Sequence, residues 1–138
     1  MIRRYKIGDA LLVDVQDEQI DEAKEGRVFF DTIIAYSLIN DDGKILAVMG
    51  YKIIENRAEC FALVGKNIGC KIIELIRFVK NKMKVDAVKW GVNRIFITVK
   101  DGFFNAKRMA KILGFRKVAK LPSFFNGNDY FLYEKRRG

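Results

Sequence analysis

Five consecutive residues, Gly65-Lys66-Asn67-Ile68-Gly69, carry the most specific chemical signal in this sequence. They follow an apolar run at positions 60–64 and precede the longest amphipathic helix pattern of the chain. A strand, a short loop and a helix start direct several backbone N–H groups at one point, where they have no intrahelical partner. The helix dipole adds roughly half a positive charge there. The sequence therefore predicts an anion site at this loop, with a phosphate as its natural ligand.

Other chemistry is limited by the residues that are missing. The 138 residues include no histidine and only two cysteines, Cys60 and Cys70. The absence of histidine excludes Ser-His-Asp and Cys-His mechanisms, and two cysteines without histidine do not make a zinc site. We expect both cysteines to be small buried residues rather than a disulfide.

The charge is divided unevenly along the chain. Positions 1–63 hold 8 Lys/Arg and 12 Asp/Glu, a net charge of −4, whereas positions 64–138 hold 18 and 5, a net charge of +13. Such a field favours a polyanionic cofactor, nucleic acid or an acidic partner, although a solubilising lysine-rich surface has the same composition. Four phenylalanines of this half would either stack on bases or lie in the core: Phe103, Phe104, Phe124 and Phe125.

Composition predicts one domain over residues 1–138. Half of the residues are hydrophobic, there is one proline, and no repeat or low-complexity tract marks a linker. The longest uncharged run is much shorter than the roughly 20 residues of a membrane span, and the first residues lack the apolar stretch of a signal peptide. We therefore expect a soluble, cytoplasmic protein with no membrane partner.

Local patterns give the element order. Strands are expected at 2–6, 32–39, 44–54, 57–64, 94–99, 115–119 and 130–133, with a hairpin turn at 40–43 and a loop at 122–129. Helices are expected at 8–13, at 17–25 with Asp17 as N-cap, from Asn67 to Trp90, and at 105–113. The longest helix has an apolar stripe of period 3.6 formed by Ile68, Ile72, Leu75, Ile76, Val79 and Met83.

This order, β-α-α-β-β-β-α-β-α-β-β, predicts an α/β fold with a mixed sheet and helices on both faces. The strands at 57–64 and 94–99 are joined by the long helix, so they should be parallel.

The same order and local signals resemble the GNAT superfamily of acyl-CoA-dependent N-acetyltransferases over essentially the whole chain. The most specific part runs from position 95 to 133 and contains Phe103-Phe104-Asn105-Ala106, Met109 and Leu113-Gly114-Phe115. The family pattern there is a strand, an Asn-x-x-Ala helix, a Gly-Phe pair and a hairpin.

The resemblance implies acyl transfer from acetyl-CoA to an unknown amine by direct attack. It places the cofactor phosphates on the loop, where Val64, Asn67 and Gly69 stand at the positions of the family's Gln/Arg-x-x-Gly-x-Gly/Ala motif. It implies Glu59 as the catalytic base. The cofactor-binding residues that it implies are Leu63, Val64, Gly65, Lys66, Asn67, Ile68, Gly69, Cys70 and Asn105.

Four positions depart from the family's pattern and leave an alternative open. Val64 stands where the loop motif has Gln or Arg, and Asn67 where it has its first glycine. Ala110 stands where the family often has a tyrosine acid, and Phe103 where it has an asparagine. The chain is also similar to small GNAT-like proteins of tailed phages, including internal virion proteins. The alternative is therefore a catalytically degenerate phage structural protein, located in the virion with other virion proteins as partners. For Glu59, the alternative role is an edge carboxylate paired with Arg57 or a neighbouring lysine.

Overall fold

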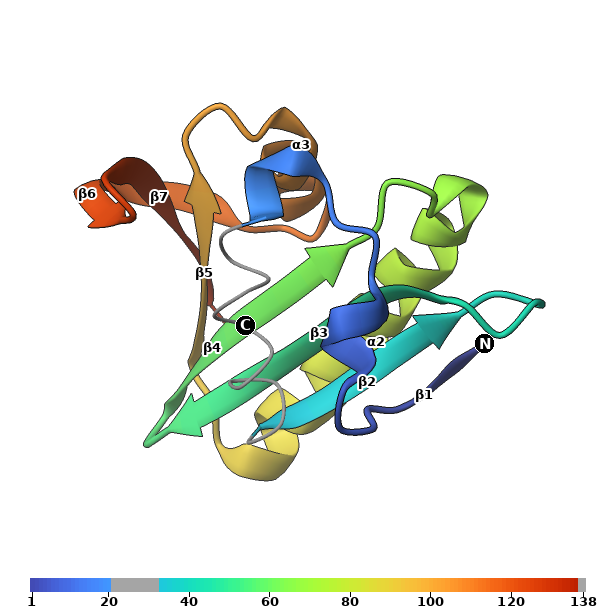
Figure 1. Cartoon of the computed structure of the whole chain (residues 1–138). Helices are drawn as coiled ribbons and strands as arrows, with labels where there is room; N and C mark the ends of the chain where they lie inside the picture. Colours follow the sequence, from blue (N-terminus) through green and yellow to red (C-terminus); the bar gives the residue numbers. More distant parts are fainter. Residues whose placement is uncertain (21–32, 137–138) are drawn as a thin grey trace. The chain divides into compact units, whose positions relative to one another are not determined.

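The computed structural model describes residues 1–20 and 33–136 (Figure 1). The helical elements are η1 (Asp9–Leu12), η2 (Asp17–Gln19), η3 (Gly69–Lys71), α2 (Ile72–Trp90) and α3 (Phe104–Ile112). The strands are β1 (Ile2–Arg4), β2 (Ile34–Ile39), β3 (Ile45–Ile54), β4 (Arg57–Val64), β5 (Arg94–Lys100), β6 (Arg116–Phe125) and β7 (Asn128–Arg136).

The seven strands form a sheet in the order β1-β2-β3-β4-β5-β7-β6. Strands β4 and β5 pair in parallel, whereas β1–β2, β2–β3, β5–β7 and β6–β7 pair antiparallel. The predicted α/β fold with a mixed sheet is confirmed, and so is the predicted parallel pair. The chain divides into two compact units, the first from Met1–Lys52 and Cys60–Leu75, the second from Ile53–Glu59 and the residues from Ile76 onward.

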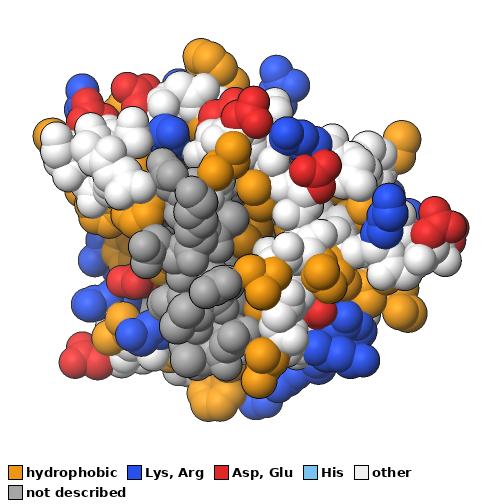
Figure 2. Space-filling model, in the orientation of Figure 1, with side chains coloured by type: hydrophobic (Ala, Val, Ile, Leu, Met, Phe, Trp, Pro, Cys, Tyr) orange, Lys and Arg blue, Asp and Glu red, His pale blue; other side chains and the backbone are white. Residues whose placement is uncertain are grey.

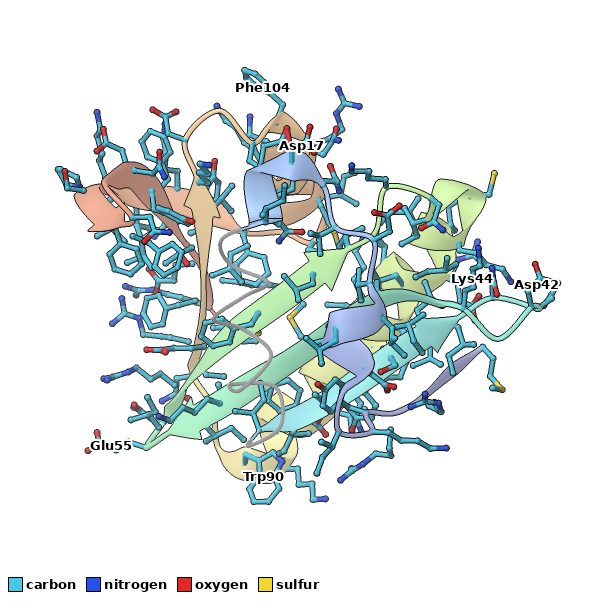
Figure 3. The ribbon with its side chains drawn as sticks, in the orientation of Figure 1. Asp17, Asp42, Lys44, Glu55, Trp90 and Phe104 are labelled. Carbon is cyan, nitrogen blue, oxygen red and sulfur yellow. The ribbon has the colours of Figure 1, made fainter. Side chains whose placement is uncertain are left out.

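In the first unit, an irregular N-terminal segment packs on the strands. Ala10 and Val13, from η1 and the residue that follows it, join a buried cluster whose other members come from β2, β3 and β4: Ala35, Ile39, Ile45, Val48 and Leu63. The predicted turn at 40–43 is present, with the Asn40 side-chain oxygen accepting hydrogen bonds from the Asp42 and Lys44 amides. Figure 3 shows Asp42 and Lys44 at the tip of this β2–β3 hairpin.

One buried carboxylate fixes the N-terminal segment. Asp9 is 5% exposed and accepts hydrogen bonds from the Arg3 guanidinium (2.7 and 3.2 Å), the Lys6 amide (2.9 Å) and the Ser37 hydroxyl (2.7 Å). Burial alone would raise the pKa of Asp9, but the hydrogen bonds from Arg3, Lys6 and Ser37 outweigh it and hold that pKa below its ordinary value. Asp9 therefore stays ionised and joins β1 and η1 to β2.

We expect Asp9→Asn to lower the free energy of unfolding by about 2–3 kcal/mol, because it leaves Arg3 without its partly buried counter-charge. Urea unfolding measures the change. The control is Asp41→Asn, which alters an exposed turn carboxylate. A loss no larger than that of the control would show that the ion pair does not stabilise the segment.

The second unit is built around β5, β7 and β6. Its buried residues include Val79, Met83, Ile95 and Val99, so the predicted apolar stripe of the long helix is buried in this part. Helix α3 ends where Gly114 adopts φ +91 and the Phe115 amide bonds back to the Ala110 carbonyl at 2.9 Å. This helix cap explains the Gly-Phe pair at 114–115.

A buried ion cluster joins β5 to β7. Glu134 is 3% exposed, and its Oε1 accepts hydrogen bonds from Arg94 Nε (2.6 Å) and Arg136 Nε (3.0 Å). The hydrogen bond from Arg94, supported by Arg136, lowers the pKa of Glu134 to about 2. The side chain is therefore a carboxylate throughout the neutral and mildly acidic range.

This pKa predicts an acid-sensitive contribution to stability. A carboxyl group with a lowered folded pKa stabilises the protein above its unfolded pKa of 4.5, and this stabilisation is lost as the pH falls toward 2. Glu134→Gln should therefore unfold more easily than wild type at pH 7, with a shallower pH dependence between about 5 and 2. Urea unfolding at several pH values checks this, with the exposed Asp101→Asn as control. Parallel pH profiles for wild type and Glu134→Gln would contradict the assignment.

Three sequence predictions need correction. The predicted loop at 122–129 is mostly strand, because β6 extends to Phe125 and β7 begins at Asn128. Asp17 is not an N-cap: Gln16 holds that position, without a capping side chain. Residues 9–12 form a short 3-10 helix, and the predicted helix at 17–25 runs into residues 21–32, outside the described part. Within the described residues, no helix is long and apolar enough to cross a membrane.

Candidate functional site

The predicted anion loop lies in the first unit, between the end of β4 and the start of η3 and α2 (Figure 1). Gly65 continues the pairing of β4, since its amide bonds to the Leu46 carbonyl of β3 at 2.8 Å. A Cβ atom at Gly65 would lie 2.7 Å from Leu46 O and 2.9 Å from Asn67 Oδ1. The loop therefore requires glycine at its first position because of close packing.

The first amides of this loop are already occupied. The Val64 amide donates to Gln19 Oε1 (3.1 Å), and the Lys66 amide donates to the Asp14 carbonyl (2.8 Å). With Gly65 bonded to Leu46, none of the three amides from 64 to 66 is available to a ligand. The sequence predicts that the Lys66 amide is part of the anion site. In the structure this amide is bonded to the Asp14 carbonyl instead.

Three later amide N–H groups of the loop are not used in hydrogen bonds among the described residues. The amides of Asn67, Gly69 and Cys70 have no acceptor among the described residues, whereas Ile68 donates to the Gly65 carbonyl. Gly69 adopts φ +52, a left-handed conformation that glycine accepts readily. The chain then enters η3 and α2, so these donors lie at the positive end of a helix. An anion at this point would meet backbone donors and a favourable dipole together.

The cations of the loop are shared with acidic neighbours. Lys66 Nζ lies 3.3 Å from Asp17 of η2, in an exposed pair, and Lys71 Nζ lies 3.6 Å from Glu74 (Figure 3 labels Asp17). The N-terminal ammonium of Met1 hydrogen-bonds Glu74 and, with Lys71, holds the pKa of Glu74 below its ordinary value. A bound phosphate would compete with Asp17 for Lys66, because exposed pairs of this kind are weak.

The cysteines around the loop differ from each other. Cys60, on β4, is half-buried, and its burial raises the pKa of its thiol to about 12, so it is not a thiolate nucleophile. Cys70 is exposed, and the prediction that it is a buried residue is wrong. Both thiols are free, as expected. The described residues contain no group of His, Cys, Asp and Glu that could hold a metal ion.

The other implied site residues lie in the second unit. Glu59 is half-buried on β4, opposite Phe96 of β5, and forms no ion pair within residues 1–20 and 33–136. Its alternative role as a paired edge carboxylate is therefore not observed. Asn105 is exposed in the first turn of α3.

Two of the four departures from the family pattern, those at Phe103 and Ala110, are apolar and buried. Phe103 is 5% exposed and Ala110 is 1% exposed, so neither position offers a proton donor. Tyr133 carries a buried hydroxyl without a hydrogen-bond partner in the described part, and burial raises its pKa. The structure therefore gives no phenol in the place that the resemblance assigns to the acid.

The four phenylalanines that would either stack on bases or lie in the core differ widely in exposure. Phe103 is buried, Phe125 is half-buried, and Phe104 and Phe124 are 73% and 54% exposed. Phe104 points away from the ribbon in Figure 3. Figure 2 shows Lys and Arg side chains at several separate places on the visible face, with Asp and Glu between them.

Sequence reasoning missed Gln19. Its carboxamide accepts from the Val64 amide and donates to the Ala62 carbonyl at 2.9 Å, and the side chain is 6% exposed. The contact joins residues more than 40 positions apart, and no local pattern around Gln19 indicates it.

Solved structures of GNAT acetyltransferases have this fold. A GNAT-family acetyltransferase from Bacillus anthracis superposes with a TM-score of 0.72 at 13% identity, covering 98% of this chain and 93% of that chain. The ribosomal-protein-S5-alanine acetyltransferase of Vibrio fischeri gives 0.71 at 13%, covering 98% and 91%. A GNAT acetyltransferase from Streptococcus pneumoniae gives 0.69 at 17%, covering 100% and 99%.

The sequence comparisons are negative: no family model matches the chain, and no curated protein matches it. The structural likeness, at identities this low, defines the fold. The protein therefore has the GNAT acetyltransferase fold, as the sequence predicts.

Close packing at Gly65 gives a test of the loop. Gly65→Ala should lower the free energy of unfolding by about 1–3 kcal/mol, because the new methyl group meets the Leu46 carbonyl of β3. Chemical denaturation measures this. Amide hydrogen exchange should also become faster at Gly65 and Lys66, whose bonds hold the loop. Unchanged exchange at both amides would show that the methyl group is accommodated without moving the loop.

Proposed function

We propose that this protein binds an acyl-CoA, with acetyl-CoA as the first candidate, and transfers the acyl group to an amine. The observation that carries the proposal is the set of three available amides, at Asn67, Gly69 and Cys70, at the start of a long helix in a GNAT fold. The donor's phosphates would accept hydrogen bonds from these amides. Lys66 and Lys71 would add positive charge beside them.

Each group on the loop has a stated role in this proposal. Gly69 gives the chain the left-handed turn that leads into the helix, and Gly65 permits close packing under the loop. Val64 and Ile68 would form the apolar part of the binding segment, whereas Leu63 supports it from the buried cluster. The resemblance also implies Asn105 of α3 as a donor-binding residue.

The transfer itself needs one proton acceptor. The amine nitrogen forms a bond to the thioester carbonyl carbon, the carbon–sulfur bond breaks, and the nitrogen loses a proton. Glu59 is the proposed acceptor of that proton, since it is half-buried and free of ion pairs among the described residues. With Ala110 in place of an acid, the leaving thiolate would take its proton from water. Holding donor and amine together would then supply most of the rate increase.

Calorimetric titration tests donor binding directly. CoA and ADP, which share the pyrophosphate, should both bind, whereas pantetheine, which has no phosphate, should bind much more weakly. Gly69→Ala should weaken CoA binding about tenfold, because its strained backbone moves the amides out of line. Gly43→Ala is the matched control: both glycines have positive φ and open space, but Gly43 lies at the β2–β3 turn. No binding of CoA at millimolar concentration would refute the proposal.

The alternative is a non-catalytic protein with the GNAT fold, for example a structural component of a phage particle. It is favoured by the buried, apolar side chains at Phe103 and Ala110. Thiol release from acetyl-CoA in the presence of an amine panel separates the two. CoA binding without thiol release for any amine would favour the non-catalytic role.

A further inference from the structure

A short segment of the N-terminal region lies along the end of β4, within the first unit. We call residues 14–19 the strap. The Asp14 carbonyl accepts from the Lys66 amide at 2.8 Å, Val15 forms a β-bridge with Gly65, and Gln16 Nε2 donates to the Val64 carbonyl at 3.3 Å. The strap therefore contacts the strand end immediately before the three available amides.

Gln19 makes the most specific contact of the strap. Its carboxamide donates to Ala62 O at 2.9 Å and accepts from Val64 N at 3.1 Å. Residues two apart on a strand direct their backbone groups to the same edge, and Gly65, one position on, bonds to β3 at the opposite edge. The Gln19 side chain thus pairs with β4 as the peptide group of a neighbouring strand would.

This position is also the one that an amide-containing ligand would use. Without Gln19, the Ala62 carbonyl and the Val64 amide would form a free acceptor and donor on one strand edge. The arm of CoA carries two secondary amides and starts from the pyrophosphate. Only two residues, Gly65 and Lys66, separate Val64 from the amide of Asn67, so this edge is within reach of an arm that leaves a phosphate held there.

We propose that Gln19 is an internal competitor for the arm of the donor, and that the strap must release Ala62 and Val64 before the full donor binds. The inference rests on the proposed function, because it takes CoA as the ligand of the loop. It adds a form of autoinhibition: the strap occupies the donor site until a ligand displaces the Gln19 carboxamide from β4.

The charges at the loop couple the two events. Asp17, the fourth residue of the strap, forms its exposed pair with Lys66 at 3.3 Å. A phosphate bound at Asn67, Gly69 and Cys70 attracts Lys66 and competes with that pair. Binding of the phosphates therefore loosens the strap at the point where the arm must enter.

Calorimetry with CoA and ADP tests the strap. Gln19→Met keeps the size of the buried side chain and removes its two hydrogen bonds to β4. CoA should therefore bind about three- to tenfold more tightly, while ADP, which has no arm, should gain clearly less. Gln16→Met, which removes one longer bond, should give a smaller effect. Glu18→Gln is the control, since Glu18 is exposed on the strap and forms no hydrogen bond or ion pair with another described residue.

The outcomes separate the two proposals. If ADP binds but CoA affinity in Gln19→Met is unchanged or weaker, the strap proposal is wrong and the phosphate site stands. If neither ligand binds wild type or variant, the proposed function fails and the strap proposal fails with it. Thermal unfolding checks that Gln19→Met is folded. If it is not, Gln19→Glu serves as the second variant, because its carboxylate accepts from Val64 and cannot donate to Ala62. It should raise the CoA affinity relative to that for ADP.

Discussion

The buried carboxylate of Asp9 is the interaction on which the candidate site depends. The N-terminal segment has little regular structure of its own: a strand of three residues, then short 3-10 turns. The Asp9 carboxylate accepts hydrogen bonds from Arg3, the Lys6 amide and Ser37, and so fixes this segment on β2. Ala10 and Val13 can then pack in the cluster, and the next residues reach the end of β4. The position of residues 14–19 thus depends on the buried carboxylate of Asp9, the first residue of η1.

Much of the fold follows from local sequence patterns. The apolar stripe of the long helix and the Asn40 turn each have a strong local cause, and β4 matches its predicted bounds. The full extent of the β6–β7 hairpin does not: strands are expected only at 115–119 and 130–133, because nearly every residue of β6 is exposed and no apolar alternation marks its second half. It is a strand because it pairs with β7 across the turn at Asn126 and Gly127. Pairing of this kind is a property of two segments together, and neither shows it alone.

The site could be predicted in position but not in detail. The order of strand, loop and helix indicates where backbone donors gather, and the glycine at 69 has the conformation that the loop needs. The donors that remain available depend on Leu46, Asp14 and Gln19, which lie 18 or more positions away. Such distant contacts leave no trace in the loop itself. The same holds for Glu134, whose partner Arg94 lies 40 positions away on β5.

Several cations of the basic half are engaged within the fold, in pairs with carboxylates that its net charge of +13 already counts. Arg94 and Arg136 both neutralise Glu134, and Lys120 lies 3.6 Å from Asp129. Lys135 donates to the Leu113 carbonyl at the end of α3, and its burial, with Lys80 and Lys84 nearby, lowers its pKa. These four cations stabilise the fold, through ion pairs on the strands or a hydrogen bond at the end of a helix. A count of lysines and arginines along a sequence therefore overstates how many of them a nucleic acid or an acidic surface would meet. The cations whose charged groups face only water are the better guide to partners.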